Sequence, residues 1–363
     1  MTFRDVVLTC LIMGLLPFCL SRPWIGVLTW SWLGYMNPHR MTWGFAYDLP
    51  FGMMVMLATV VGLVITRDKK GLPNAIEVYL LLALWGWFLV TTIFAFYPDD
   101  AWIQFNKVSK ILVGIFLSLF LLQDARKLRA LIWVIALSIG FFGVKGGIFS
   151  IMTGAQNQVL GPRDSFISGN TEIGLALNMV IPLLVFLQRE ETKLWRRRLL
   201  MAAAILSIIA SLGTYSGGAL VGLAVVVPLV FLKSRPRLIL LPLLAVAIFV
   251  LPSVMPRQWL ERMGTIETYE QDVSANQGLN SWYVARERAK DYPIMGGGFR
   301  TFSKDIYEAY MPGYKYAENA LDAHSIYFQV LGEHGFTGLA LFVALIASTL
   351  LSLRRIIWKT RRE

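Results

Sequence analysis

Only three histidines occur in the chain, and two of them lie near its C-terminus. His324 closes a charged stretch in the sequence Asp322-Ala-His-Ser, and His334 follows in a Gly-Glu-His-Gly sequence. An imidazole with an ordinary pKa of about 6.5 suits a general base at neutral pH. We expect His324 to have this role, because an acid lies two residues before it and an apolar segment begins directly after it. A lone histidine at an interface is more often a satisfied polar residue, and this alternative stays open for His334 and His39.

Basic side chains form the second group, because the arginine fork binds phosphate in a bidentate way. Lys145 stands alone inside the apolar run Gly-Phe-Phe-Gly-Val-Lys-Gly-Gly, and an ionisable residue within a bilayer marks a functional site by default. Two alternatives stay open: snorkelling of the Lys145 ammonium to the interface, and ion pairs between the arginines and acids such as Glu287. The candidates for an anionic ligand are Lys145, Arg163, Arg286, Arg288 and Arg300, within a wider group that adds Arg40, Arg257 and Arg262.

Motifs for other chemistry are lacking. No HExxH, GxSxG or Walker sequence occurs, and the glycines at 296–298 lack the strand-to-helix context of a nucleotide loop, so we predict a tight turn there. The pair Asp99-Asp100 is typical of a helix start rather than a metal site. Cys10 and Cys19 lie in the first apolar stretch without ligand spacing, which predicts small apolar fillers and no disulfide framework. We expect no metal and no cofactor.

Apolar helices must position these residues. The chain has 363 residues, 56% hydrophobic and 16% charged, with a mean hydropathy of +0.57, whereas a soluble domain carries about 25% charged residues. A spanning helix needs about 20 apolar residues. We predict an all-α polytopic membrane protein of about 11–12 transmembrane helices, with a break at Gly335 in the last segment. The segments are residues 6–20, 24–36, 50–66, 77–96, 108–122, 128–152, 173–187, 199–212, 217–232, 238–254 and 326–353.

The formal net charge of +11 is explained by topology rather than by nucleic-acid binding. Basic residues gather in every second loop, at positions 67–70, 126–129, 189–198 and 233–237, and again in the tail from position 354. The positive-inside rule places these loops and the C-terminus in the cytoplasm, and the N-terminus and the large polar loop 256–324 outside. We expect the first segment to be retained, since Ser21-Arg-Pro is not a small-residue cleavage site.

Several stretches together resemble the O-antigen ligase/polymerase superfamily. Residues 322–339 resemble that family's histidine-containing re-entry after its large outer loop, residues 292–299 its loop motif, and residues 214–222, with Thr-Tyr-Ser-Gly-Gly, its helix-start motif. The N-terminal half is similar to the exosortase A-associated O-glycosylation ligases in residues 21–28, 35–48 and 140–147. The resemblance divides the chain into an N-terminal transmembrane region, 1–170, and a ligase-like catalytic region, 171–363.

This resemblance implies a C-type glycosyltransferase of the bacterial inner membrane. Such an enzyme takes a glycan from an undecaprenyl-diphosphate carrier and passes it, with inversion and without a metal, to a protein or lipid acceptor at the periplasmic face. We expect His324 to be the base in this reaction, oriented by Asp322 or by a neighbouring acid of the loop. The alternatives are a repeat-unit polymerase and, from another class, a lipid-linked glycan transporter or flippase. The residues expected to bind the diphosphate or glycan are Lys145, Arg163, Ser216, Arg286, Arg288, Arg300 and His334.

Two positions depart from the family's pattern. Gly217 and Gly278 stand where the family usually has arginines that serve the diphosphate. Either other cations of this chain, such as Arg163 or Lys145, supply the missing charge, or the chain is an inactive variant.

Overall fold

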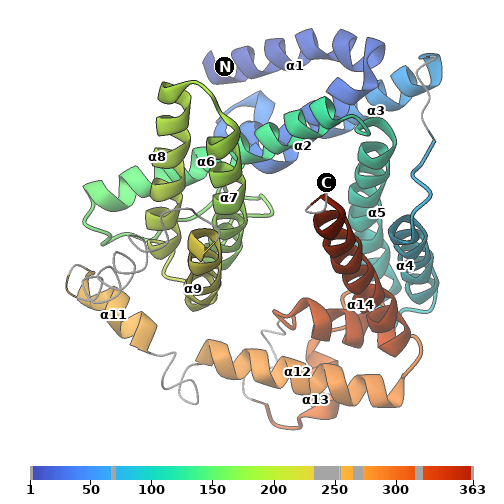
Figure 1. Ribbon diagram of the computed structural model, residues 1–363. Coiled ribbons are helices and arrows are strands. Elements are labelled where there is room, and N and C mark those ends of the chain that lie inside the picture. The colour runs from blue at the N-terminus through green and yellow to red at the C-terminus, as the bar shows by residue number, and fades with distance from the viewer. Residues whose placement is uncertain are drawn as a thin grey trace. The chain divides into compact units, whose positions relative to one another are not determined.

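The computed structural model describes residues 3–66, 71–232, 253, 255–264, 273–314 and 322–360, and contains helices but no strand within these ranges. Contacts divide the chain into two units: Met1–Lys69 with Leu121–Glu267 (unit 1), and Lys70–Phe120 with Thr268–Glu363 (unit 2). Unit 1 contains α1 (Phe3–Ser21), α2 (Pro23–Met36), η1 (Pro38–Met41), η2 (Phe45–Tyr47), α3 (Phe51–Ile65), α6 (Ala125–Met152), α7 (Asn170–Glu190), α8 (Leu194–Leu212), α9 (Gly217–Leu232) and α11 (Arg257–Gly264) (Figure 1). Unit 2 contains α4 (Ile76–Ile93), most of α5 (Pro98–Leu121), α12 (Val273–Asp291), α13 (Lys304–Tyr310) and α14 (Ile326–Thr360).

The predicted fold class, an all-helical polytopic membrane protein, is confirmed. Among the described residues, six helices are long and apolar enough to cross a membrane, namely α1, α4, α5, α6, α7 and α14. The helix α3 and residues Gly217–Val230 are apolar but shorter. Ten of the predicted segments coincide with helices, and the remaining one, 238–254, lies outside the described residues except for Ser253.

Two local predictions are confirmed as well. The helix α5 begins at Pro98 and carries Asp99 and Asp100 in its first turn, where carboxylates favour the positive end of the helix dipole. The helix α14 is broken at Gly335, whose φ of 67° and ψ of −171° are not helical. A Cβ atom there would lie 2.4 Å from the carbonyl oxygen of Ile294, so both backbone conformation and space require glycine.

The stretch 256–324, predicted as one large polar loop, contains three helices within its described residues: α11, α12 and α13. In unit 2, α12 packs against α13 and α14, and α14 packs against α4 (Figure 1). A small core fixes this arrangement, made of the buried residues Val284, Ala285, Phe302, Tyr307 and Ala323. The described part of this polar stretch therefore contains ordered helices as well as loops.

In unit 1, α6 packs closely against α8 because glycines face the contact. A Cβ atom on Gly143 would lie 2.1 Å from Ser207 Oγ, and one on Gly147 would lie 2.4 Å from the Leu206 carbonyl oxygen. Glycines four residues apart allow two helix backbones to approach in this way. At 3.6 residues per turn, Lys145 then lies on the opposite face of α6 from these glycines. The α8 contact thus orients the lysine.

We expect Gly147→Ala to lower the melting temperature, because the added methyl group must displace the α8 backbone. Overpacking of this kind typically costs about 1–3 kcal/mol. The matched control is Gly14→Ala in α1, where the new Cβ atom meets nothing within 4 Å. Thermal unfolding of the full chain in detergent measures both variants. If Gly147→Ala and Gly14→Ala have the same melting temperature, the close packing of α6 against α8 is contradicted.

Candidate functional site

His324 lies in the short segment that leads into α14, with its side chain exposed and its backbone in the left-handed region at φ 48°. The residue before it is fixed: Trp282 Nε1 donates to the Ala323 carbonyl oxygen at 2.7 Å, and the Ala323 N–H donates to Gln329 Oε1 at 2.8 Å. The Trp282 ring stacks on Phe328 with centroids 5.0 Å apart. A left-handed conformation costs a non-glycine residue on the order of 1–3 kcal/mol and is concentrated at functional sites. An exposed imidazole is therefore held on an ordered backbone.

Asp322, the predicted orienting acid, is exposed as well. Within the described residues no hydrogen bond joins its carboxylate to the His324 imidazole. The orienting role of Asp322 therefore stays a prediction.

A buried acid, Glu333, lies near this segment, and the sequence predictions assign no role to it. Glu333 is 5% exposed, and its Oε1 accepts hydrogen bonds from the Arg300 backbone N–H at 2.9 Å and from Gln329 Nε2 at 2.7 Å. Since Gln329 also holds Ala323, the carboxylate connects the backbone at Arg300 with the backbone before His324. The glycine turn predicted at 296–298 is present here, and the Gly298 N–H donates to the Glu333 carbonyl oxygen at 2.7 Å.

His334 differs from His324 because it belongs to the core of unit 2. Its side chain is 1% exposed, and its Nδ1 lies 2.7 Å from Thr91 Oγ1 on α4. The ring packs against Phe88 and Phe299, with centroids 4.3 Å and 4.5 Å away. This environment fixes the break in α14 against α4.

The three predicted arginines of unit 2 have different surroundings. Arg286 is exposed, and its Nε donates to Oε1 of the neighbouring Glu287 at 3.0 Å. For Arg286 the structure thus shows the ion pair that was the alternative to an anionic ligand. Arg300 is exposed with φ 55°. Arg288 is 1% exposed and lies over the Phe96 ring at 4.3 Å. Its Nε and Nη2 have no hydrogen-bond partner among the described residues, and burial lowers the pKa of its guanidinium.

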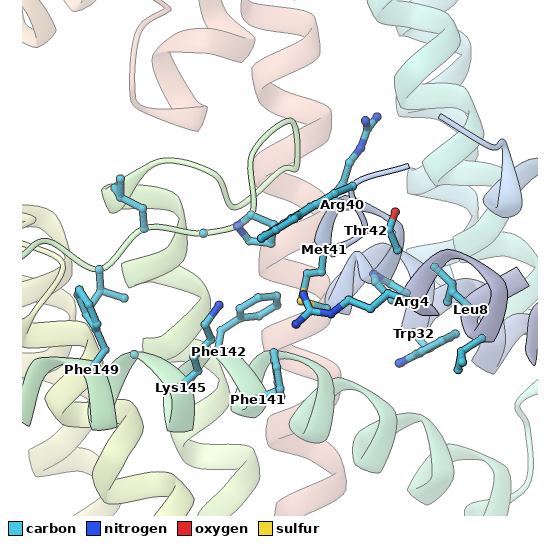
Figure 2. A pocket seen from close by; sticks show the side chains of 18 of the residues that line it. Arg4, Leu8, Trp32, Arg40, Met41, Thr42, Phe141, Phe142, Lys145 and Phe149 are labelled. Carbon is cyan, nitrogen blue, oxygen red and sulfur yellow. The ribbon is translucent and has the colours of Figure 1, made fainter. Parts of the chain in front are cut away.

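A cavity of about 900 Å³ lies in unit 1, lined by α1, α2, η1, α6 and residues 158–162. The basic residues of its lining are Arg4, Arg40 and Lys145, and no acidic residue lines it. In Figure 2 the Arg4 and Lys145 side chains reach into the same space from α1 and α6, whereas the Arg40 guanidinium points away from them. Much of the wall is aromatic: Trp32, Trp43, Phe141, Phe142 and Phe149.

Two further predicted residues lie in unit 1. Arg163 is exposed directly after Pro162, the last residue of the cavity lining, and does not itself line the cavity. Ser216 is 6% exposed in the predicted turn between α8 and α9. Its Oγ accepts from the Ala219 N–H at 3.2 Å and lies 3.2 Å from Thr171 Oγ1. This geometry is that of a helix N-cap for α9.

Comparison with known families gives two matches. Residues 3–192 match a family of unknown function, DUF5935, and this match covers more than half of the chain. The chain belongs to the DUF5935 family. Residues 202–343 match the O-Antigen ligase family, which supports a glycan ligase or polymerase type of function and a membrane-embedded, glycosyltransferase-like enzyme that acts on a lipid-linked glycan. No curated protein and no solved structure matches the chain.

The candidate site residues of this DUF5935 protein fall into two groups, one in each matched region. The lining of the cavity runs from Phe3 to Pro162 and lies wholly within the DUF5935 match. His324 and Glu333 lie within the O-Antigen ligase match. Sequence reasoning missed Arg4, Gln329 and Glu333. The sequence carries a local signal for Glu333, because this acid directly precedes His334. It carries no local signal for Arg4, because the residues that line the cavity with it are distant in sequence.

Proposed function

We propose that this protein is a glycan ligase that transfers a glycan from an undecaprenyl-diphosphate carrier to a hydroxyl group of a protein or lipid acceptor. The observation that carries the proposal is the O-Antigen ligase match over residues 202–343, which includes the exposed and backbone-anchored His324. The N-terminal motifs at 21–28, 35–48 and 140–147 favour the exosortase A-associated type. The proposal assigns catalysis to residues 171–363.

In the proposed reaction His324 takes the proton of the acceptor hydroxyl, while Asp322 orients the protonated imidazole. The acceptor oxygen attacks the anomeric carbon from the face opposite the diphosphate, so the configuration inverts. The bond between that carbon and the diphosphate oxygen breaks, and the carrier leaves with the electron pair and the negative charge. Because a diphosphate is already a good leaving group, the remaining tasks are positioning and neutralisation of charge.

The cations proposed for the diphosphate include Lys145, Arg163 and the exposed Arg286 and Arg300. Burial favours a positioning role for Arg288 and His334, since both are 1% exposed. The capping geometry of Ser216 likewise favours a structural role at the start of α9.

We propose that the site faces the periplasm from the inner membrane. The alternation of basic loops motivates this orientation. The unit 1 cavity supports it, because Arg4, Arg40 and residues 158–162 line one space. The alternation of basic loops places the N-terminus and the loops that contain Arg40 and residues 158–162 on the outer side.

A transfer assay separates the three candidate functions. We expect the purified full chain, given undecaprenyl-diphosphate-linked glycan and a mixture of periplasmic protein and lipid acceptors, to attach the glycan to an acceptor. A polymerase would instead lengthen the lipid-linked glycan. A transporter would form no covalent product and would move labelled lipid between the leaflets of proteoliposomes. Either of the latter outcomes would contradict the proposed ligase.

A further inference from the structure

The cavity of unit 1 combines fixed positive charge with an apolar wall. Phe141, Lys145 and Phe149 recur at four-residue spacing along α6 and therefore share one helix face. The two phenylalanines are 40% and 41% exposed. From α1, Val7 and Leu11 add apolar surface, with 47% and 48% of their side chains exposed. A cation thus lies in the middle of a stripe that can accept a hydrocarbon chain.

The positive charge at the cavity is not neutralised from within it. Neither Arg4 nor Lys145 has an ion pair among the described residues, and no acid lines the space. The acids nearby in sequence or structure have other partners. Asp5, although it follows Arg4, is buried, and its Oδ1 accepts from the Gly44 and Ala46 N–H groups at 3.2 Å each.

Two further acids, Asp48 and Asp164, contact Arg40 and Tyr47 respectively. The Asp48 carboxylate lies 3.9 Å from the Arg40 guanidinium, which also stacks over Tyr47 at 4.5 Å. The Tyr47 hydroxyl donates to Asp164 at 2.5 Å. Arg40 therefore has an acid partner at the rim. The charge without an acid partner comes from Lys145 and from Arg4, whose guanidinium lies over the Trp43 ring at 5.8 Å.

We propose that the region of unknown function binds a phosphorylated lipid, with the phosphate between Arg4 and Lys145 and the hydrocarbon chain along the wall of Phe141, Phe149, Val7 and Leu11. Two cations from different helices can share the oxygens of one phosphate. A small hydrophilic anion would leave the exposed apolar stripe in contact with water, so the wall favours an amphiphile. The site stands on this geometry alone, whereas the identity of the lipid as the donor carrier rests on the proposed function.

The test measures lipid binding to the full-length protein in nanodiscs of zwitterionic phosphatidylcholine by native mass spectrometry. We expect undecaprenyl diphosphate to bind, and Arg4→Ala and Lys145→Ala each to weaken its binding about tenfold, since each removes one charge-assisted contact. Val7→Trp adds bulk to the wall without changing charge and should weaken binding as well. Lys193→Ala and Arg197→Ala remove exposed basic side chains of unit 1 that do not line the cavity, and they should bind as the wild type does.

Two competitors identify what the site recognises. Phosphatidylglycerol that competes as well as undecaprenyl diphosphate would support the lipid-phosphate site and assign it to bulk anionic phospholipid. Tighter binding of undecaprenyl diphosphate than of phosphatidylglycerol would assign the site to the donor carrier. Inorganic pyrophosphate that competes as effectively as either lipid would overturn the proposal, as would unchanged binding in the Arg4 and Lys145 variants.

The inference and the proposed function can fail separately. A wild-type protein that binds lipid through Arg4 and Lys145 but transfers no glycan contradicts only the ligase assignment. Active transfer with lipid binding that is unchanged by both substitutions contradicts the cavity assignment, and with it the role of Lys145 toward the diphosphate, but not the ligase activity.

Discussion

His324→Ala is expected to slow glycan transfer by about 10²–10⁴-fold, which is the typical contribution of a positioned general base, while binding of the donor lipid stays unchanged. The side chain is exposed, and the hydrogen bonds that fix this segment are made by Ala323, Trp282 and Gln329 rather than by the imidazole. Removal of the imidazole therefore removes the proposed proton acceptor but none of the hydrogen bonds that hold the segment. Single-turnover transfer and lipid binding, measured on the same preparation, separate the two effects.

A second substitution makes this test independent of backbone strain. His324 has φ 48°, a conformation that asparagine tolerates better than most residues. His324→Asn therefore keeps the backbone but removes the base, and it should be as slow as His324→Ala. His39→Ala in η1 is the matched control, because it removes a histidine of the other unit, and it should transfer at the wild-type rate. Near wild-type transfer by both His324 variants, with unchanged melting temperatures, would rule out the base assignment.

Hydropathy anticipated the fold where apolar runs were long. The runs predicted at 128–152 and 326–353 correspond to α6 and α14. The break at Gly335 could be predicted because a glycine interrupts a long helical segment. The start of α5 was placed at residue 108, although the helix begins at Pro98, because polar residues fill its first turns. The helices of the 256–324 stretch were missed for a related reason: their apolar faces are short, and tertiary packing stabilises them.

The site was less predictable, because burial depends on residues distant in sequence. Arg286 and Arg288 lie two positions apart on α12 and so face nearly opposite ways, but the sequence does not say which side meets the core. The structure buries Arg288 against Phe96. His324 and His334 carry the same side chain, and each lies close to an acid in the sequence. Contacts from residues distant in sequence, namely Thr91 and Phe88 of α4 and Phe299, make His334 a core residue.

Glu333→Leu is expected to give the second largest effect, lowering both the melting temperature and the transfer rate. The leucine side chain cannot accept the hydrogen bonds from the Arg300 N–H and Gln329 Nε2, and each donor left without a partner costs about 1–3 kcal/mol. Once Gln329 is released, the Ala323 backbone loses its defined acceptor, so the geometry before His324 relaxes. We expect kcat to fall more than KM rises, because the network fixes the backbone before His324 and contacts only one of the proposed donor-binding cations, Arg300, through its backbone N–H.

Glu333→Gln distinguishes a positioning role from a charged one. Both observed hydrogen bonds end on a single carboxylate oxygen, Oε1, and the carboxamide oxygen of glutamine can accept the same two bonds. If Glu333 acts by holding Arg300 and Gln329 in place, Glu333→Gln should recover most of the stability and transfer that Glu333→Leu loses. A glutamine variant as slow as the leucine variant, but with a wild-type melting temperature, would instead show that the reaction needs the carboxylate itself. Paired measurements of kcat, KM and melting temperature on the two variants decide between these roles.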